Sequence, residues 1–345
     1  MTHRFPVKEI ALQSGTSVAT VDRVLHGRQN VSPQTRRRVM DALNELEGQE
    51  QQLSARGRRL FFDFLVEAPK RFSSEIRQAV EREIQTTRTA VIRPRFLFQE
   101  QMSDEQCLAH LERIIQRGSH GVCLKVRDRP AIHEAIAELA AKKIPILTLF
   151  TDIPQSKRLA YLGMDNEKAG KIAAYLISQS LPKEASKGSV LLTRSHEEFV
   201  GEEERARGFT AAIKSLRPEL DLLDMSGAAG LHQSTIEQLR AMLPDQPDIV
   251  AVYSIGGGNR AIIECLDQFD IHPVCFVAHD LDKSNHSLLT REKIQYVLHD
   301  RLQDDMAAAF HHLLRAHNLC PEISPSPTGS EIHIIVPAHV SDGLG

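Results

Sequence analysis

Residues 15–28, GTSVATVDRVLHGR, carry side chains suited to recognition of a nucleic acid rather than to catalysis, since they hold no carboxylate pair and no metal-ligand spacing. Arg23 has a fork of N–H donors that fits the two acceptors of guanine, and Val18 and Ala19 could pack on a thymine methyl group. Hydroxyl and amide groups suit phosphate oxygens, which position a protein without reading sequence. The phosphate and end-of-helix candidates are Ser17, Thr20, His26, Asn30, Ser32 and Thr35.

Three short helices are expected to present these residues. Apolar residues at helical spacing predict a short first helix, through Val7, Ile10, Ala11 and Leu12, and a second through Val18, Val21, Val24 and Leu25. Thr16 or Ser17 can cap the second helix. Gly15 lies between them, and glycine allows the left-handed backbone of a tight turn. Ser32 and Pro33 are typical of a helix start, and a third helix is predicted to run to Leu46. This order predicts a helix-turn-helix head whose second helix enters the major groove.

The charge distribution agrees with a head that binds a polyanion. Residues 1–60 carry ten Lys and Arg against six Asp and Glu, although the whole chain has a net charge of −3. A basic segment on an acidic body favours nucleic acid as a partner, but a charge excess of four is also common on a solvated face. The alternative to a DNA-binding head is therefore a small helical bundle whose arginines keep it soluble.

The stretch VKEIALQSGTSVATVDRVLHGRQNVSPQTRRRVMDALNEL resembles the DNA-binding head of the LacI/GalR (lactose-repressor) family of bacterial transcription regulators. The resemblance covers about forty residues without a gap, through the S-x-x-T-V-x-R-V-L core, N-V-S-P-x-T-R and A-L-x-E-L. It implies that Val18, Ala19 and Arg23 read bases. Asp22 departs from it, because the family usually has a serine there that contacts phosphate. A carboxylate would repel phosphate unless Asp22 pairs with a nearby arginine.

The match weakens after Leu46. The family continues through Pro-Asn into a hinge helix that inserts a leucine into the minor groove, whereas this chain reads EGQEQQLSARGRRL and is a few residues shorter. Gln51-Gln52-Leu53 resembles the hinge, so Leu53 is the candidate wedge. The alternative is a polar linker with an incidental leucine.

From Leu60 onward, apolar strands alternate with amphipathic helices, which is the pattern of parallel sheets in doubly wound α/β domains. About 285 residues exceed one such sheet, so two lobes are expected, dividing near residues 163–166. Strands are predicted at 60–66, 91–98, 121–126, 145–150, 160–163, 189–193, 220–225, 248–254, 273–279 and 296–299. Helices are predicted, among others, at 166–180, 202–216, 231–242, 258–269 and 301–317.

Ligands in such folds bind outside the carboxyl ends of the strands, so two lobes would share a cleft lined by the residues that follow each strand. Phe72 could stack on a sugar, Asp152 and Asp280 could accept hydroxyl groups, and Arg205 could donate from a helix start. Lys125, Asn259 and His299 are the remaining candidates, and Arg127 adds a further cation. Each has a structural alternative: an Asp can cap a helix, Phe72 can be core, and His299 can be satisfied in a turn.

The second part of the chain also resembles that family, whose effector domain is similar to type I periplasmic sugar-binding proteins. RLAYLGMDNEKAGKIAAYL is similar to the segment that crosses between the lobes. ERARGF and AHD match elements whose Arg205 and Asp280 would bind effector. YVLHD places His299 where the family usually has glutamine, which would add pH dependence. SIGGGN places Asn259 near a polar ligand position, and its glycines lack both phosphate-loop patterns.

Several classes of protein are disfavoured. No apolar run approaches the ~20 residues of a membrane helix, and the first residues lack an apolar signal core, so we expect a cytoplasmic protein. The five cysteines are scattered without a CxxC pair, which disfavours a zinc site or a disulfide framework. We expect no cofactor and no metal.

Together these patterns predict a transcription regulator, of repressor type. The expected fold is an all-α helix-turn-helix head joined to a two-lobed α/β domain. We expect a head at 1–47, a hinge or linker at 48–59 and an effector domain at 60–345. Its first lobe would hold about 60–163 and 300–320, and its second about 164–299 and 321–345. A homodimer would bind a palindromic operator, controlled by a small sugar or polyol, with or without a phosphate or acidic group. The alternatives are a sugar-binding carrier without regulation and a sugar-acting enzyme.

Overall fold

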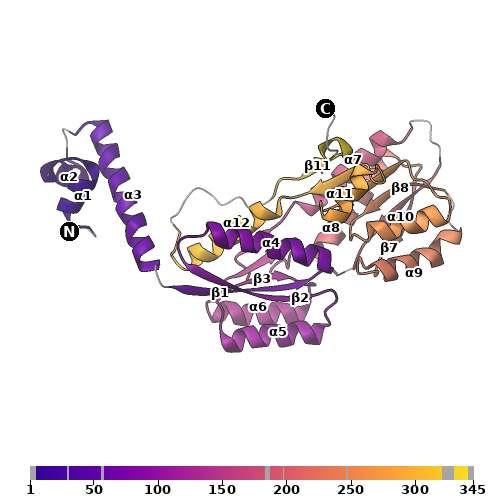
Figure 1. Cartoon of the computed structure of the whole chain (residues 1–345), viewed down its shortest axis with the longest axis horizontal. Coiled ribbons are helices and arrows are strands. Elements are labelled where there is room, and N and C mark those ends of the chain that lie inside the picture. The colour runs from indigo at the N-terminus through magenta and orange to yellow at the C-terminus, as the bar shows by residue number, and fades with distance from the viewer. Residues whose placement is uncertain are drawn as a thin grey trace.

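A computed structural model describes residues 5–28, 31–55, 58–182, 187–196, 198–245, 248–320 and 330–340; the side chains of 48–55 and 245 are outside that description. Figure 1 shows a small helical head joined by one long helix to a two-lobed body. Within the described residues, no helix is long and apolar enough to cross a membrane.

The head consists of three helices around its own apolar core. They are α1 (Val7–Ser14), α2 (Val18–Leu25) and α3 (Pro33–Ala55). Gly15 has φ 61° at the end of α1, which gives the tight turn predicted from sequence. The buried core of the head consists of Phe5, Ile10, Ala11, Val21, Val24, Val39, Leu43 and Leu46. The head is thus a folded unit built on the predicted helix-turn-helix spacing.

Helix α3 is longer than the sequence indicates. It continues without a break from Pro33 to Ala55, although a helix end was predicted at Leu46. Residues 51–53, which resemble the hinge, therefore lie in the same helix as the head's third helix. The predicted wedge Leu53 has its backbone in α3, but its side chain lies outside the described residues. At 1.5 Å per residue, the 23 residues of α3 span roughly 34 Å, and the head packs around its first half.

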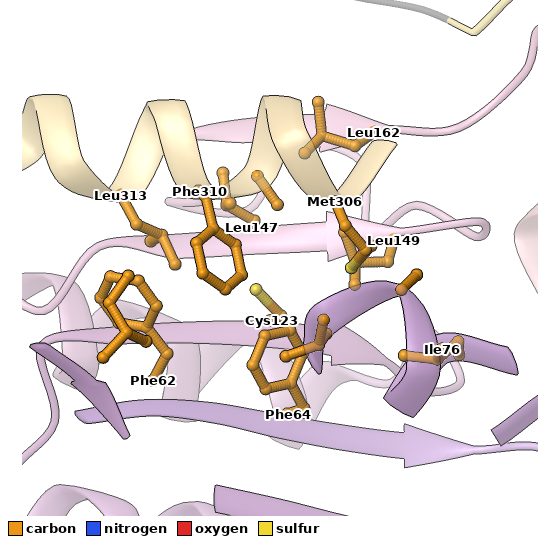
Figure 2. Packing of buried hydrophobic residues seen from close by; sticks show 14 of the residues in the cluster. Phe62, Phe64, Ile76, Cys123, Leu147, Leu149, Leu162, Met306, Phe310 and Leu313 are labelled. Atoms are coloured by element: carbon orange, nitrogen blue, oxygen red, sulfur yellow. The ribbon is translucent and has the colours of Figure 1, made fainter. Parts of the chain in front are cut away.

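The first lobe is a five-stranded parallel sheet in the order β2-β1-β3-β4-β5. Its strands are β1 (Arg59–Glu67), β2 (Val91–Gln99), β3 (Gly121–Lys125), β4 (Ile146–Leu149) and β5 (Ala160–Leu162). Its helices are α4 (Lys70–Thr86), α5 (Asp104–Arg117), α6 (Pro130–Ala141) and α12 (Leu302–Ala316). Helix α12 follows the second lobe in sequence but packs on this sheet, where Figure 2 shows Phe310 and Leu313 pointing down onto Phe62 and Leu147.

The apolar run LFFDFLV becomes β1 because both faces of a parallel sheet are covered by helices. Phe62 meets Phe310 edge to face, with ring centroids 5.6 Å apart. Asp63 is the one polar residue in the run and is fully buried. The guanidinium groups of Arg95, at 2.7 Å, and of Arg117 bind its carboxylate, which offsets the cost of burying that charge.

The second lobe is a six-stranded sheet in the order β11-β10-β9-β8-β6-β7, parallel except for β11. Its strands are β6 (Ser189–Thr193), β7 (Asp221–Met225), β8 (Ile249–Ser254), β9 (Cys275–His279), β10 (Tyr296–His299) and β11 (His333–Ile335). Its helices are α7 (Asn166–Ser180), α8 (Val200–Leu216), α9 (His232–Met242), α10 (Asn259–Gln268) and α11 (Lys283–Thr290), with 3₁₀ turns at Leu243–Asp245 and Pro337–His339.

The chain passes between the lobes near Met164 and again near Asp300. Ser330 lies beside the first crossing, because its N–H donates to the Gly163 carbonyl at 3.1 Å. All ten predicted strands are present, with bounds within two residues. The sequence reading missed β11, a three-residue antiparallel edge strand too short to give a periodic signal.

Candidate functional site

One face of α2 is exposed and carries the predicted base-reading residues. Val21 and Val24 are buried against the head's core, whereas Ala19, Arg23 and His26 are exposed. Val18 is 47% exposed, which is unusual for a valine that has a core beside it. An apolar side chain left open beside an arginine fork is what contact with base edges would require.

A pair of hydroxyl side chains lies at the start of α2, and a second pair lies at the start of α3. Ser17 Oγ accepts the N–H of Thr20 at 3.1 Å and lies 2.8 Å from its hydroxyl. Ser32 and Thr35 repeat this geometry, with the same two distances, at the start of α3. Both serines therefore cap helices whose first N–H groups are exposed to solvent, and helix N-termini favour anions such as phosphate. The fifth predicted phosphate contact, Asn30, lies outside the described residues.

Asp22 is held by an arginine and a histidine. Its Oδ2 lies 3.3 Å from Nη1 of Arg28, and its Oδ1 lies 3.1 Å from Nδ1 of His26. The carboxylate that replaces the family's serine is therefore paired with an arginine, which is the condition under which its repulsion of phosphate is reduced.

The body holds a cavity of about 480 Å³ between the two lobes. It lies at the carboxyl ends of β1, β3, β4, β6, β8, β9 and β10, as expected for parallel sheets that face each other. Its lining includes the segment after β1 (Glu67–Phe72), Phe150 and Thr151 after β4, the glycine turn before α10, and the segment after β9 (His279–Asn285).

Five of the seven predicted effector residues line this cavity: Phe72, Lys125, Arg205, Asn259 and Asp280. Two do not, which corrects their predicted placement. Asp152 is turned toward Arg158 and accepts the hydroxyl of Thr148 at 2.7 Å. His299 is the last residue of β10, and its Nδ1 accepts the Leu281 N–H at 3.3 Å. The position after a strand was predicted correctly, but the sequence could not give the direction of these side chains.

Arg205 has its charged end at the cavity. It is 8% exposed, and its Nε donates to Asn166 Oδ1 at 2.7 Å. Within the described part of the chain, no residue accepts from its two Nη groups. A buried guanidinium with free donors is prepared for a ligand's oxygen atoms, since unpaired donors in such a place cost free energy.

Asp280 presents a carboxylate beside that arginine. Its backbone is in the left-handed region, at φ 65°, where non-glycine residues are rare and often functional. Its N–H donates to Leu298 and its carbonyl accepts from Asn285, so the strained backbone is held on both sides. Burial raises the pKa of Asp280 to about 6, with Asp300 adding to the rise and Arg205 opposing it.

The cap of the following helix is Asp282 rather than Asp280. Asp282 accepts the Asn285 N–H at 2.8 Å and begins α11. Among the described residues, nothing donates to the Asp280 carboxylate. Asp280 is therefore not the cap of this helix, which was its structural alternative.

An asparagine pair connects two turns of the cavity wall. Asn259 Nδ2 donates to Asn285 Oδ1 at 2.7 Å, and Asn285 Nδ2 donates to the His279 carbonyl at 2.8 Å. Asn259 Oδ1 and His279 Nδ1 are buried without a partner in the described structure. Burial holds the pKa of His279 well below its usual range, so its ring is neutral. The sequence reading found Asn259 but missed His279 and Asn285.

The opposite wall is aromatic. Phe72 meets Phe150 edge to face with ring centroids 5.1 Å apart, and Phe199 lies 4.0 Å beneath the Lys125 ammonium. Lys125 also donates to the Glu67 carbonyl at 3.0 Å, and burial lowers its pKa. Phe150 and Phe199 were missed, because an isolated Phe after a strand gives no sequence signal that separates a cavity wall from a core.

Polar bonds join the lobes on both sides of the cavity. Arg71 of α4 donates to the Gly230 carbonyl at 3.0 Å across the cleft. Arg127, a further predicted cation, binds Glu67 at 3.1 Å and Glu198 of the second lobe at 2.9 Å, so it does not face the cavity. The described residues contain no group of three His, Cys, Asp or Glu side chains that could hold a metal ion.

Comparison with known families agrees with both parts of the chain. Residues 7–47 match the bacterial regulatory proteins of the lacI family. Residues 67–316 match the periplasmic binding protein domain family, which covers more than half of the chain. The chain belongs to the periplasmic binding protein domain family and carries a lacI-family head. The resemblance inferred from the sequence motifs is therefore confirmed.

Solved structures share the fold of the body at low sequence identity. A glucose-galactose binding protein, GanP from Geobacillus stearothermophilus, has 17% identity and a TM-score of 0.71, over 81% of this chain and 98% of its own. A solute binding protein from Burkholderia graminis in complex with D-arabinose has 16% identity and a TM-score of 0.72, over 84% and 99%. A protein from Bacteroides fragilis assigned as a LacI transcriptional regulator has 15% identity and a TM-score of 0.70, over 82% of this chain and 99% of its own.

These identities establish a common fold for residues of the body and no more. No curated protein sequence matches the chain at a significant level.

Proposed function

We propose that this chain is a sequence-specific transcription regulator, of repressor type, whose affinity for an operator is set by a small molecule in the lobe cleft. The observation that carries this proposal is the presence, in one chain, of an exposed reader helix and a cleft with unpaired polar groups. We assign residues 1–47 to the head, 48–59 to the connection and 60–345 to the effector domain. The two family matches support both halves.

On DNA, α2 would lie in the major groove. Arg23 would bind a guanine, and Val18 and Ala19 would contact thymine methyl groups. The capped starts of α2 and α3 would hold phosphates, with Ser17 and Ser32 nearest to them. Leu53 stays a predicted minor-groove wedge, although the unbroken α3 equally suits a linker.

We propose that two chains bind one operator. A single head of this size reads a short half-site, and a two-fold dimer would place two heads on a palindromic sequence. The support for the dimer is the lacI-family head, and the oligomeric state can be measured directly by light scattering with and without DNA.

The ligand we propose is a small sugar or polyol. Asp280 would accept hydrogen bonds from hydroxyl groups, Arg205 would donate to ring or hydroxyl oxygens, and the unpaired Asn259 Oδ1 would accept a further hydrogen bond. Phe72 and Phe150 would pack on the apolar C–H face of the ring. One of the similar structures is named a glucose-galactose binding protein and another is a solute binding protein in complex with D-arabinose, which supports this class.

A neutral ligand suits the cavity's charge better than an anionic one. Arg71 is paired with Asp282, and Arg127 is paired with two glutamates. Lys125 lies in a setting that lowers its pKa. Arg205 has Asp280 and the buried Asp300 near it, and these carboxyl groups offset its charge.

Ligand would act by changing how the lobes meet. The first strand of the first lobe, β1, follows α3 of the head in sequence, and the second lobe contributes Arg205, Asn259 and Asp280 to the cavity. A ligand that contacts both lobes stabilises the closed arrangement by its differential affinity for the two states. The effect on operator affinity is equal to the reciprocal effect of operator on ligand affinity.

The alternatives gain less support. A sugar carrier would not need the head, and an enzyme would need an acid and base at the ligand. Asp152 and His299, which could have served with Asp280, do not line the cavity. The retained alternative is a sugar-binding protein whose head has no regulatory role.

A fluorescence-anisotropy titration tests the function. The protein is titrated into DNA from upstream of its own gene and into random DNA at one salt concentration, with and without a panel of sugars and polyols. Salt is fixed because phosphate contacts make affinity strongly salt-dependent. Sequence-selective binding that one compound alters supports the proposal, whereas equal binding to both DNAs, unaltered by any compound, contradicts it.

A further inference from the structure

The exposed face of α2 has a carboxylate near its centre. At 100° per residue, Asp22 lies between Val18 and Ala19 around the helix, one turn further along. Val18, Asp22 and His26 are spaced by four residues and form one row, and Ala19 and Arg23 form the adjacent row. Asp22 therefore lies among the proposed base-reading residues rather than at the edge of the helix.

The contacts of Asp22 fix its carboxylate without using all of its capacity. His26 Nδ1 lies 3.1 Å from Oδ1 and Arg28 Nη1 lies 3.3 Å from Oδ2, while 40% of the side chain stays exposed. An ionised carboxylate has about four acceptor sites, so at least one per oxygen is left for a donor from outside. His26 also lies 2.9 Å from the Asp22 carbonyl through the same Nδ1, which limits movement of the ring.

Arg28 also lowers the electrostatic cost of bringing this carboxylate to DNA. Arg28 is 63% exposed and follows α2 directly after Gly27, where φ is 64°. Its guanidinium offsets the negative charge that phosphates would otherwise repel. A serine at this position would bind phosphate, but an ionised carboxylate can only accept hydrogen bonds and needs a donor on the DNA.

In the major groove, cytosine is the base that presents a hydrogen-bond donor without an acceptor beside it. Its N4 amine donates, whereas adenine places the N7 acceptor beside its N6 amine, and guanine and thymine present acceptors. We propose that Asp22 is a specificity-determining residue that accepts a hydrogen bond from the N4 amine of a cytosine in each half-site, with Arg28 and His26 as positioning residues. This inference rests on the proposed function, because it requires that the head reads an operator.

The test compares base preferences of full-length variants. Preferred half-sites are selected from randomised DNA for the wild type, Asp22→Ser and Arg23→Ala. The wild type is expected to prefer cytosine, by about fivefold in affinity, at one position that Asp22→Ser alone makes indifferent. Arg23→Ala should relax a different position. Asp41→Asn is the matched control, since it removes one exposed charge from α3 and should change no base preference.

A modified base in the DNA tests the contribution of the cytosine N4 amine alone. Pyrimidin-2-one in place of that cytosine lacks the exocyclic amine, so it should weaken wild-type binding about fivefold and leave Asp22→Ser binding unchanged. Circular dichroism of each variant checks that the head is folded, and serine is the residue that the family usually has here. Selective wild-type binding with the same preferences in Asp22→Ser overturns the inference. Absence of any wild-type selectivity instead overturns the proposed function.

Discussion

Arg71 and Asp282 face each other across the lobe cleft, with Arg71 Nε 3.2 Å from Asp282 Oδ2. Arg71 comes from α4 of the first lobe, and Asp282 begins α11 of the second. The same guanidinium donates to the Gly230 carbonyl at 3.0 Å. An alanine at Gly257 would put a Cβ atom 2.1 Å from Arg71 Nη2, so this turn must be glycine for the arginine to lie over it. Arg71 therefore joins the two lobes at the rim of the cavity.

We expect Arg71→Gln to weaken closure of the cleft. A partly exposed ion pair contributes up to about 1 kcal/mol, so ligand affinity should fall by about fivefold or less. The radius of gyration of the ligand-free protein, measured by small-angle X-ray scattering, should rise. Lys70→Gln removes the adjacent, highly exposed charge and should change neither quantity. Unchanged scattering and affinity in Arg71→Gln would mean that the contact does not hold the lobes together.

Asp280→Asn should remove the ligand response and keep operator binding. The carboxylate receives no hydrogen bond from described residues, so its loss breaks no internal contact, while a bound hydroxyl loses its charged acceptor. Calorimetric titration with the ligand identified by the anisotropy screen should show a loss of affinity of more than tenfold, or about 1.4 kcal/mol. Thermal melting provides the check, because a structural role would lower the melting temperature and the proposed role would not.

Ligand binding should depend on pH through Asp280. Burial raises its pKa to about 6, and hydroxyl donors stabilise the ionised form, so binding lowers that pKa and releases protons. Affinity for a neutral sugar should therefore rise as pH increases from about 5 to about 7. Titrations in two buffers of different ionisation enthalpy measure the protons released. Affinity that falls over this range would exclude the ionised carboxylate as the acceptor.

The stability of the ligand-free protein should change in the opposite direction. The pKa of Asp280 rises from an ordinary 3.8 to about 6, and burial with Asp300 raises that of Asp305 to about 7. A raised pKa adds stability that is complete below about pH 4 and is lost as pH rises through the folded value. The free energy of unfolding contributed by these groups should thus fall between about pH 4 and 7. Urea titrations of Asp280→Asn should show a smaller fall.

The fold was largely predictable because its signals are local. Helix starts such as Ser17 and Ser32, and apolar runs such as LFFDFLV, give periodicity and capping that single segments carry. The position of cavity residues after strands follows from topology, which placed Asn259 and Asp280 correctly. What failed was direction: Asp152 follows β4 as predicted but binds Arg158, a partner six residues away that only the folded loop brings near.

Missed residues had no local signal at all. His279 is the last residue of β9 and reads as an interior strand position, yet its ring borders the cavity because Tyr253 holds Nε2 at 2.8 Å. The continuation of α3 to Ala55 was missed because Gly48 and a polar segment are typical of a helix end. The position of the His279 ring thus depends on a residue distant in sequence. The length of α3 depends on a helix that continues through Gly48.

Arg23→Ala should separate base reading from general attraction to DNA. Arg23 is exposed on α2 beside Val18 and Ala19, where its fork can reach two acceptors of one guanine. We expect a cost of about 1–3 kcal/mol on operator DNA and far less on random DNA at the same salt. Arg37→Ala, an exposed arginine on α3, is the matched control and should weaken both by a similar factor if it contacts phosphate. Equal losses on both DNAs for Arg23→Ala would make Arg23 a phosphate contact and leave base reading to the other residues of the α2 face.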